Sequence, residues 1–221
     1  MSKNIKLAIV IIISLYTSAY AHRPIFTDQK GTDAKTAVKI TDPNISQVIY
    51  RPLTDKTPQL WLTINAEKDF ELFVQIGIPA IERQKLFRPS FVILGPGLEK
   101  ISMPFDTPKV IGGKDFPTTE IEKPEFFHER FTKTDSWILR SEKLNLPATG
   151  KYYIVAYSPL NEKGKLWISV GQKENFGFLD IFRFPGWKKN IRNYHETDLQ
   201  QKTKPKSHSK RFPRKLPGHK R

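Results

Sequence analysis

Residues 59–65 read Gln-Leu-Trp-Leu-Thr-Ile-Asn, and this stretch decides the fold class. Leu60, Leu62 and Ile64 occupy every second position, so they share one face of an extended chain. A period of two is typical of a β-strand that buries one of its faces, because successive side chains of a strand point to opposite sides. The stretch therefore predicts a half-buried strand.

Similar short runs recur on both sides of it, separated by segments that contain Pro, Gly, Asn or Asp. They lie at residues 36–41, 45–50, 70–78, 91–94, 137–139, 152–157 and 165–170. Helical periodicity is almost absent between them, so we predict an all-β protein built as an antiparallel β-sandwich, immunoglobulin-like or jelly-roll-like. Residues 79–87 are expected to form one or two helical turns, and residues 99–140 a long, partly structured crossing over the sandwich.

The first 21 residues have the pattern of a secretory signal peptide. Lys3 and Lys6 precede an apolar run at residues 7–16, and Ala19-Tyr20-Ala21 supplies small residues before a cleavage point. A membrane-spanning helix needs roughly 20 apolar residues, about twice the length of this run. We therefore predict an exported mature chain, periplasmic or extracellular, that begins at His22. An uncleaved anchor is the alternative.

Positive charge is concentrated at the C-terminus. The formal net charge is +15, and residues 188–221 hold 12 Lys and Arg against two acidic residues, which leaves residues 22–187 close to neutral. Residues 200–221 contain three Pro and only two large apolar residues, too few to offset the entropy of ordering, so a disordered tail is predicted. Such a tail is attracted to an anionic membrane surface, lipopolysaccharide or a polyanionic glycan, or it only keeps the chain soluble. Nucleic acid is not an expected partner of an exported chain.

A segment of different composition, residues 176–194, precedes this tail. Large apolar residues, most of them aromatic, alternate there with basic residues, and Pro185-Gly186 divides the segment into two short pieces, for which a short helical structure is expected. One interpretation is that the segment packs back on the sheet and caps the core. The other is that it lies in a membrane interface, which would make the protein peripherally membrane-associated.

Composition and motifs exclude several kinds of chemistry. The chain has no Cys, which removes disulfides, thiolate catalysis, Cys-ligated zinc and iron–sulfur clusters. The sequence contains no phosphate-binding Gly loop, no zinc-protease helix motif and no nucleophile elbow. No catalytic or organic-cofactor-binding residues are therefore predicted, and we favour a binding module over an enzyme.

Three His residues outside the tail, His22, His128 and His195, are the candidate metal ligands. A His at a mature N-terminus offers its amine and its imidazole as one chelate, and a second imidazole completes a three-nitrogen site suited to copper. We expect the second imidazole to come from His195, or from His128, and each is followed by a Glu that can orient or bind the metal. The pattern resembles the histidine-brace proteins, which include lytic polysaccharide monooxygenases and periplasmic copper-binding sandwich proteins. The resemblance implies copper as the cofactor.

Residues 22–196 also resemble a family of exported bacterial β-sandwich proteins to which no activity is attached. The segments that carry this resemblance are 22–24, 42–50, 95–98 and 164–167. We divide the chain into a signal peptide (1–21), a β-sandwich domain (22–175), an aromatic and basic segment (176–199) and a basic tail (200–221). The predicted function is an exported binding module of the cell envelope or extracellular space, held near anionic surfaces by its tail. The alternative is a copper-binding protein with an N-terminal histidine brace, acting in copper handling rather than in oxidative catalysis.

Overall fold

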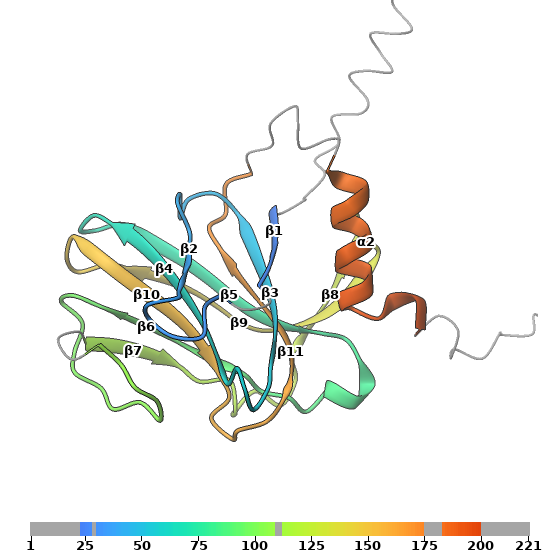
Figure 1. The fold of residues 1–221 in the computed structure, drawn as a ribbon, viewed down its shortest axis with the longest axis horizontal. Coiled ribbons are helices and arrows are strands. Elements are labelled where there is room, and N and C mark those ends of the chain that lie inside the picture. The colour runs from blue at the N-terminus through green and yellow to red at the C-terminus, as the bar shows by residue number, and fades with distance from the viewer. Residues whose placement is uncertain (1–22, 28–29, 109–111, 175–182, 200–221) are drawn as a thin grey trace, which may run out of the picture.

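The computed structural model describes residues 23–27, 30–108, 112–174 and 183–199 (Figure 1). The predicted signal peptide, its cleavage point at His22 and the basic tail lie outside these ranges. Within them, no helix has both the length and the apolar character that crossing a membrane requires.

Two β-sheets face each other, and one helix lies beside them (Figure 1). Sheet A has the strand order β1-β3-β11-β5-β9-β8, and sheet B has the order β2-β4-β10-β6-β7. In chain order the elements are β1 (Arg23–Phe26), β2 (Val38–Lys39), β3 (Gln47–Leu53), β4 (Gln59–Ala66), β5 (Glu71–Pro79), the 3₁₀ turn η1 (Glu82–Gln84), β6 (Ser90–Gly95), β7 (Gly112–Phe116), β8 (Glu125–Glu129), β9 (Thr134–Asn145), β10 (Gly150–Tyr157), β11 (Gly164–Val170) and α2 (Phe184–Tyr194).

The core lies between the two sheets and is made by alternate residues of their strands. Leu60, Leu62 and Ile64 of β4 are all buried, as the period-two pattern predicts. They pack with the inward residues of neighbouring strands, among them Leu72, Val74 and Ile76 of β5, Phe91 and Ile93 of β6, and Ile154 of β10. Burial of this apolar surface is the main force that holds the sandwich together.

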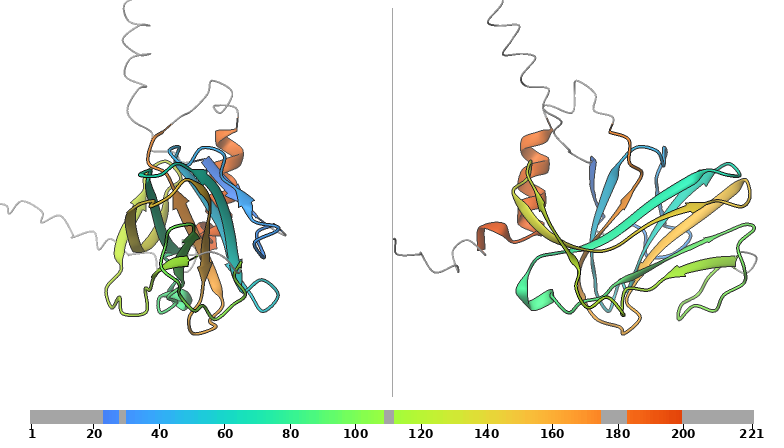
Figure 2. Two further views of the ribbon diagram at one scale, coloured as in Figure 1. Left: turned by 90° about the vertical axis from the view of Figure 1, so that its left-hand side faces the viewer. Right: turned by 180° about the vertical axis from the view of Figure 1, so that it is seen from behind.

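A β-bulge bends sheet A where β5 pairs with β9. The register shifts between Ile76 and Gly77, so that Ile76 lies opposite Arg140 and Gly77 opposite Ile138. An extra residue on one strand increases the local twist, and Figure 2 shows β5 and β9 curving across the molecule toward α2. At Gly77 a side chain has no room, because a Cβ there would lie 2.3 Å from the Trp167 ring.

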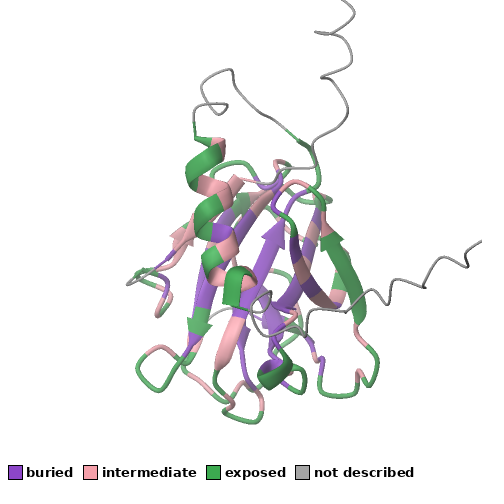
Figure 3. Cartoon of the chain, turned by 90° about the vertical axis from the view of Figure 1, so that its right-hand side faces the viewer, coloured by how far each residue is buried: buried purple, intermediate pink, exposed green. Residues whose placement is uncertain are grey.

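Helix α2 covers part of the outer face of sheet A. Ile191, its buried residue, packs against Val48, Tyr50 and Trp167 of the sheet, while the rest of the helix surface is half-buried or exposed (Figure 3). Pro185 occupies the first turn of the helix, where its missing N–H would have no partner in any case. Pro185 therefore lies at the start of the helix, and the part of the segment before it, residues 176–182, lies outside the described residues.

The predicted all-β sandwich with a short C-terminal helix is confirmed, and so is the helical turn within residues 79–87. The sheets are antiparallel except where β1 pairs with β3 and β2 pairs with β4, both in parallel. The expectation of a crossing over the sandwich at residues 99–140 is wrong, because β7, β8 and the first half of β9 belong to the sheets themselves. Their sequences are rich in Gly and charged residues and lack the alternation that identifies a half-buried strand.

Candidate functional site

A pocket of about 290 Å³ lies on the outer face of sheet A, beside the C-terminal end of α2. Typical small-molecule pockets begin at roughly 300 Å³, so this one suits a small ligand or a single side chain. It is lined by Ser46, Val48, Tyr50, Phe73, Gln75, Phe127, Glu129, Thr134, Ser136, Ile138, Trp167, Ser169, Gly171, Gln172, Glu174 and His195.

Strand alternation explains which side chains reach this pocket. Phe127 and Glu129 are two residues apart on β8, and their partners on β9 are Ser136 and Thr134. All four line the pocket, because residues separated by two positions share one face of a strand and paired residues lie side by side. The intervening His128 pairs with Asp135 and belongs to the opposite face.

His195 closes one side of the pocket through a chain of hydrogen bonds. Its Nδ1 lies 2.9 Å from the carbonyl oxygen of Ile191, and since a carbonyl only accepts, Nδ1 carries the proton. Its Nε2 then accepts from the Ser136 hydroxyl at 3.1 Å, and the same hydroxyl oxygen accepts the Trp167 indole N–H at 3.2 Å. Burial lowers the pKa of His195 to about 4, so the imidazole is neutral near pH 7.

Two carboxylates supply the negative charge of the pocket. Glu129 is partly buried, and its Oε1 accepts the backbone N–H of Phe131 at 2.8 Å. Burial raises the pKa of Glu129, and the charge of Glu174 raises it further. Burial also raises the pKa of the Tyr50 hydroxyl, with a contribution from the charge of Glu129, so Tyr50 is a neutral donor at this site.

The end of α2 is fixed to the sheet by a second set of charged contacts. The carboxylate of Glu196 accepts two hydrogen bonds from Arg83, one of them 2.7 Å long, and one of 2.8 Å from Lys165 Nζ. These partners, Arg83 first, lower the pKa of Glu196 to about 2. Because Glu196 follows His195 directly, this contact also holds the imidazole in the wall of the pocket.

The three candidate metal ligands do not share one site among the described residues. His195 is buried, with both ring nitrogens in hydrogen bonds. His128 is exposed, with its Nδ1 2.6 Å from Asp135 Oδ1, and His22 lies outside the described residues. Across the described ranges, no three His, Asp or Glu side chains gather closely enough to hold a metal ion. The copper site stays a prediction.

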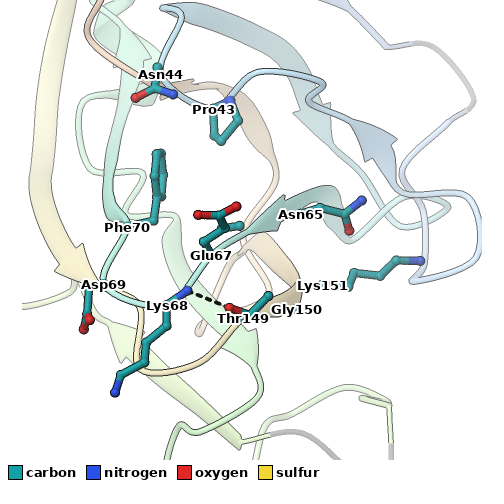
Figure 4. A pocket seen from close by; sticks show the side chains of 11 residues that line it. Pro43, Asn44, Asn65, Glu67, Lys68, Asp69, Phe70, Thr149, Gly150 and Lys151 are labelled. Atoms are coloured by element: carbon teal, nitrogen blue, oxygen red, sulfur yellow. Dashed lines mark hydrogen bonds between the residues drawn. The ribbon is translucent and has the colours of Figure 1, made fainter.

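A second, larger hollow of about 710 Å³ opens at one end of the sandwich, between the β4–β5 and β9–β10 turns (Figure 4). Its rim is mostly turn residues, and Figure 4 shows the side chains of Lys68, Asp69 and Lys151 pointing in different directions. The backbone N–H of Lys68 donates to Thr149 Oγ1 at 3.0 Å, which ties the two turns together. Few side chains converge there, so the pocket beside α2 is the better candidate site.

The sequence analysis identified His195 but missed Glu129, Ser136, Trp167 and Glu174 as members of one site. A signal was present in β8, where Phe127 and Glu129 are two residues apart. It was not recognised because the strand is short and its residues are mostly exposed.

No protein-family model and no curated protein matches the sequence. Among solved structures, the chain is similar to Aeromonas hydrophila PliG, a periplasmic lysozyme inhibitor of g-type lysozyme, with a TM-score of 0.33 and 17% identity over 68% of this chain and 98% of that chain. It is also similar to the pre-peptidase C-terminal domain of collagenase from Bacillus anthracis, with a TM-score of 0.31 and 11% identity over 65% of this chain and 98% of that chain. At these levels of similarity, neither structure indicates the function of this chain.

Proposed function

We propose that this chain is an exported β-sandwich binding module that takes its ligand in the pocket beside α2 and is drawn to anionic surfaces by its basic tail. The pocket carries the proposal, since aromatic rings and polar groups from five strands of sheet A converge there with His195 of the helix end. The signal-peptide pattern supports export of the chain.

Binding fits the chemistry of the pocket better than catalysis. A general base needs a free nitrogen or oxygen within hydrogen-bond reach of its substrate. His195 meets this requirement poorly, because Ser136 and Ile191 occupy its two ring nitrogens and its pKa lies near 4. Trp167 and Tyr50 instead offer rigid, largely buried walls, which are typical of recognition.

The surface-binding part of the proposal is tested with vesicles. The full chain should bind phosphatidylcholine vesicles that contain phosphatidylglycerol, and bind pure phosphatidylcholine weakly, because each basic residue near an anionic surface contributes about 1 kcal/mol. Binding should fall steeply from about 0.1 M to about 1 M salt, over which the Debye length drops from about 10 to about 3 Å.

The matched variant carries Gln in place of the nine Lys and Arg of residues 200–221. It should lose the salt-sensitive binding, whereas a control with Gln at the exposed Lys39, Lys56 and Lys123 should keep it. Equal binding by the two variants would show that the tail does not carry the attraction.

A copper-binding protein with a histidine brace is the second candidate, and one contact favours it. Arg23 N–H donates to the carbonyl of Ser46 at 3.3 Å, and Ser46 borders the pocket that also holds Glu129 and Glu174. Arg23, which follows His22 in the sequence, is therefore hydrogen-bonded at the border of an acidic pocket.

This second candidate is tested by Cu(II) titration of two chains, one that begins at His22 and one with a Met before it. A brace uses the terminal amine, so the added Met should weaken binding by orders of magnitude, and His22→Ala should do the same. Affinity should fall as the pH drops toward about 5, because protons compete for the amine and the imidazole. Equal affinity of the two chains for Cu(II) would exclude a brace.

A further inference from the structure

The charged groups of the pocket beside α2 all have one sign. Glu129 and Glu174 are its charged side chains, and the remaining lining residues include no Lys or Arg. His195 is neutral near pH 7, since its pKa is about 4. The pocket is therefore an acidic cavity with aromatic walls.

This negative charge is not neutralised by the described part of the chain. Neither Glu129 nor Glu174 forms an ion pair there. Burial is the largest influence on the pKa of Glu129 and raises it overall, although the Phe131 N–H and the charges of His128 and Lys133 act in the opposite direction, and the charge of Glu174 adds to the rise. A cation bound near the two carboxylates would offset their mutual repulsion. It would also neutralise negative charge in a partly buried site.

The size and walls of the cavity fit the end of a basic side chain. About 290 Å³ equals the share of liquid volume of roughly ten water molecules. Phe127 and Tyr50 line the pocket, and aromatic rings attract ammonium and guanidinium groups within about 6 Å of the ring centre. The methylene stem of a Lys or Arg gains from the same apolar contacts.

We propose that this pocket is a cation-binding site and that its occupant in the isolated chain is a Lys or Arg side chain of the protein's own tail, residues 200–221. The assignment rests on the proposed function, in which the same pocket is the ligand site and the same tail binds anionic surfaces. The assignment further implies that the pocket and an anionic surface compete for the same Lys and Arg side chains of the tail.

Tethering and charge single out the tail as the occupant. The tail follows Leu199, only four residues beyond the His195 that closes the pocket, and it carries nine basic residues and no acidic one. Its 22 residues span at most about 70 Å when extended, so the pocket is well within reach. Because the tail is covalently attached, its basic groups also have a local concentration at the pocket on the order of millimolar, against which a free monovalent cation must compete.

Zero-length cross-linking of the full chain tests this contact directly. A carbodiimide activates a carboxylate, and an adjacent Lys amine then displaces the urea leaving group to form an amide. We expect amides between tail Lys residues and Glu129 or Glu174, within monomers, at low salt. Glu129→Gln with Glu174→Gln should abolish them, and the matched control, Gln at the exposed Glu99 and Glu122, should keep them.

Two results would overturn the assignment. Amides between tail lysines and Glu99 or Glu122 that are as frequent as those with the two pocket carboxylates would mean that the tail has no preferred site. Alternatively, the pocket amides would appear only in covalent dimers, which would make the occupant the tail of a second copy.

Vesicle binding separates the failure of this inference from that of the proposed function. Release of the tail by the double Gln variant of Glu129 and Glu174 should tighten binding to anionic vesicles about threefold to tenfold, because the fraction of free tail rises. Unchanged vesicle affinity together with absent pocket amides rejects the inference and leaves the proposed function intact. If the native chain does not bind anionic vesicles, the proposed function is rejected. The cross-links still decide whether the tail occupies the pocket.

Discussion

The outer faces of the two sheets are covered in different ways. On sheet B, an apolar cluster around Trp61, Val92 and Val155 is covered by loop residues such as Ala37 and Phe105. On sheet A, helix α2 provides the cover, and the layer beneath it holds hydrogen bonds, ion pairs and a pocket. One cover buries apolar surface, and the other also positions polar groups.

This difference indicates which side of the molecule responds to pH and salt. Contacts between apolar groups, as around Trp61, do not depend on pH or salt to first order. The layer under α2 contains a buried neutral imidazole, His195, and a carboxylate held ionised, Glu196, and both respond to pH. The sheet A side should therefore lose its cover under conditions that leave sheet B intact.

Removal of an aromatic ring should have its largest effect on the sheet B side. Trp61 is 2% exposed and contacts Phe105 and Tyr153 edge to face, so Trp61→Ala should lower the free energy of unfolding by about 3–5 kcal/mol. Trp187 of α2 is only half-buried, and Trp187→Ala should cost about 1 kcal/mol. Urea denaturation measures both. Equal losses for the two variants would contradict the comparison.

Acid should destabilise the sheet A side through His195. Its pKa is about 4 in the folded chain and about 6.5 when unfolded. Between these values the unfolded chain binds a proton that the folded chain does not, so stability is full above about pH 6.5 and falls as the pH drops toward 4. The loss should total roughly 3 kcal/mol.

The control for this prediction is His195→Gln, which removes the titrating group. Denaturation series at several pH values should show a smaller loss in this variant between about pH 6.5 and 4. Parallel curves for the variant and the native chain would mean that His195 titrates normally in the folded state.

The ion pairs at the end of α2 should contribute less. Glu196→Gln should lower the free energy of unfolding by about 1–2 kcal/mol near neutral pH, with allowance for the largely exposed Arg83. The pKa of Glu196 is lowered from its ordinary value to about 2, so this contribution is complete above about pH 4.5 and is lost as the pH falls toward 2. Glu82→Gln, in an exposed pair with Lys85, should cost less than about 0.5 kcal/mol.

A small effect on stability is also expected from the tail. Gln in place of its basic residues should change the free energy of unfolding by less than about 1 kcal/mol, because exposed charge contacts contribute little. Thermal unfolding of the two full chains checks this. A markedly lower transition temperature for the variant would show that residues 200–221 belong to the fold.

The sequence predicted the inner core better than the outer layer, for a physical reason. Leu60, Leu62 and Ile64 reveal their strand by local alternation, which one short segment displays. The hydrogen bonds of His195 with Ser136, and of Ser136 with Trp167, join residues 59 and 31 positions apart. Such contacts follow from the bulge at Gly77 and the docking of α2, and neither has a local pattern.

The indole N–H signals of Trp167 and Trp61 in the NMR spectrum of the full chain test the central claim most directly. Trp167 Nε1 donates to Ser136 in the wall of the acidic pocket, and Trp61 lies in the apolar cluster on sheet B. When the basic residues of the tail are replaced by Gln, the Trp167 signal should shift and the Trp61 signal should stay in place. An unchanged Trp167 signal, or equal shifts of both signals, would contradict a tail held in the pocket beside α2.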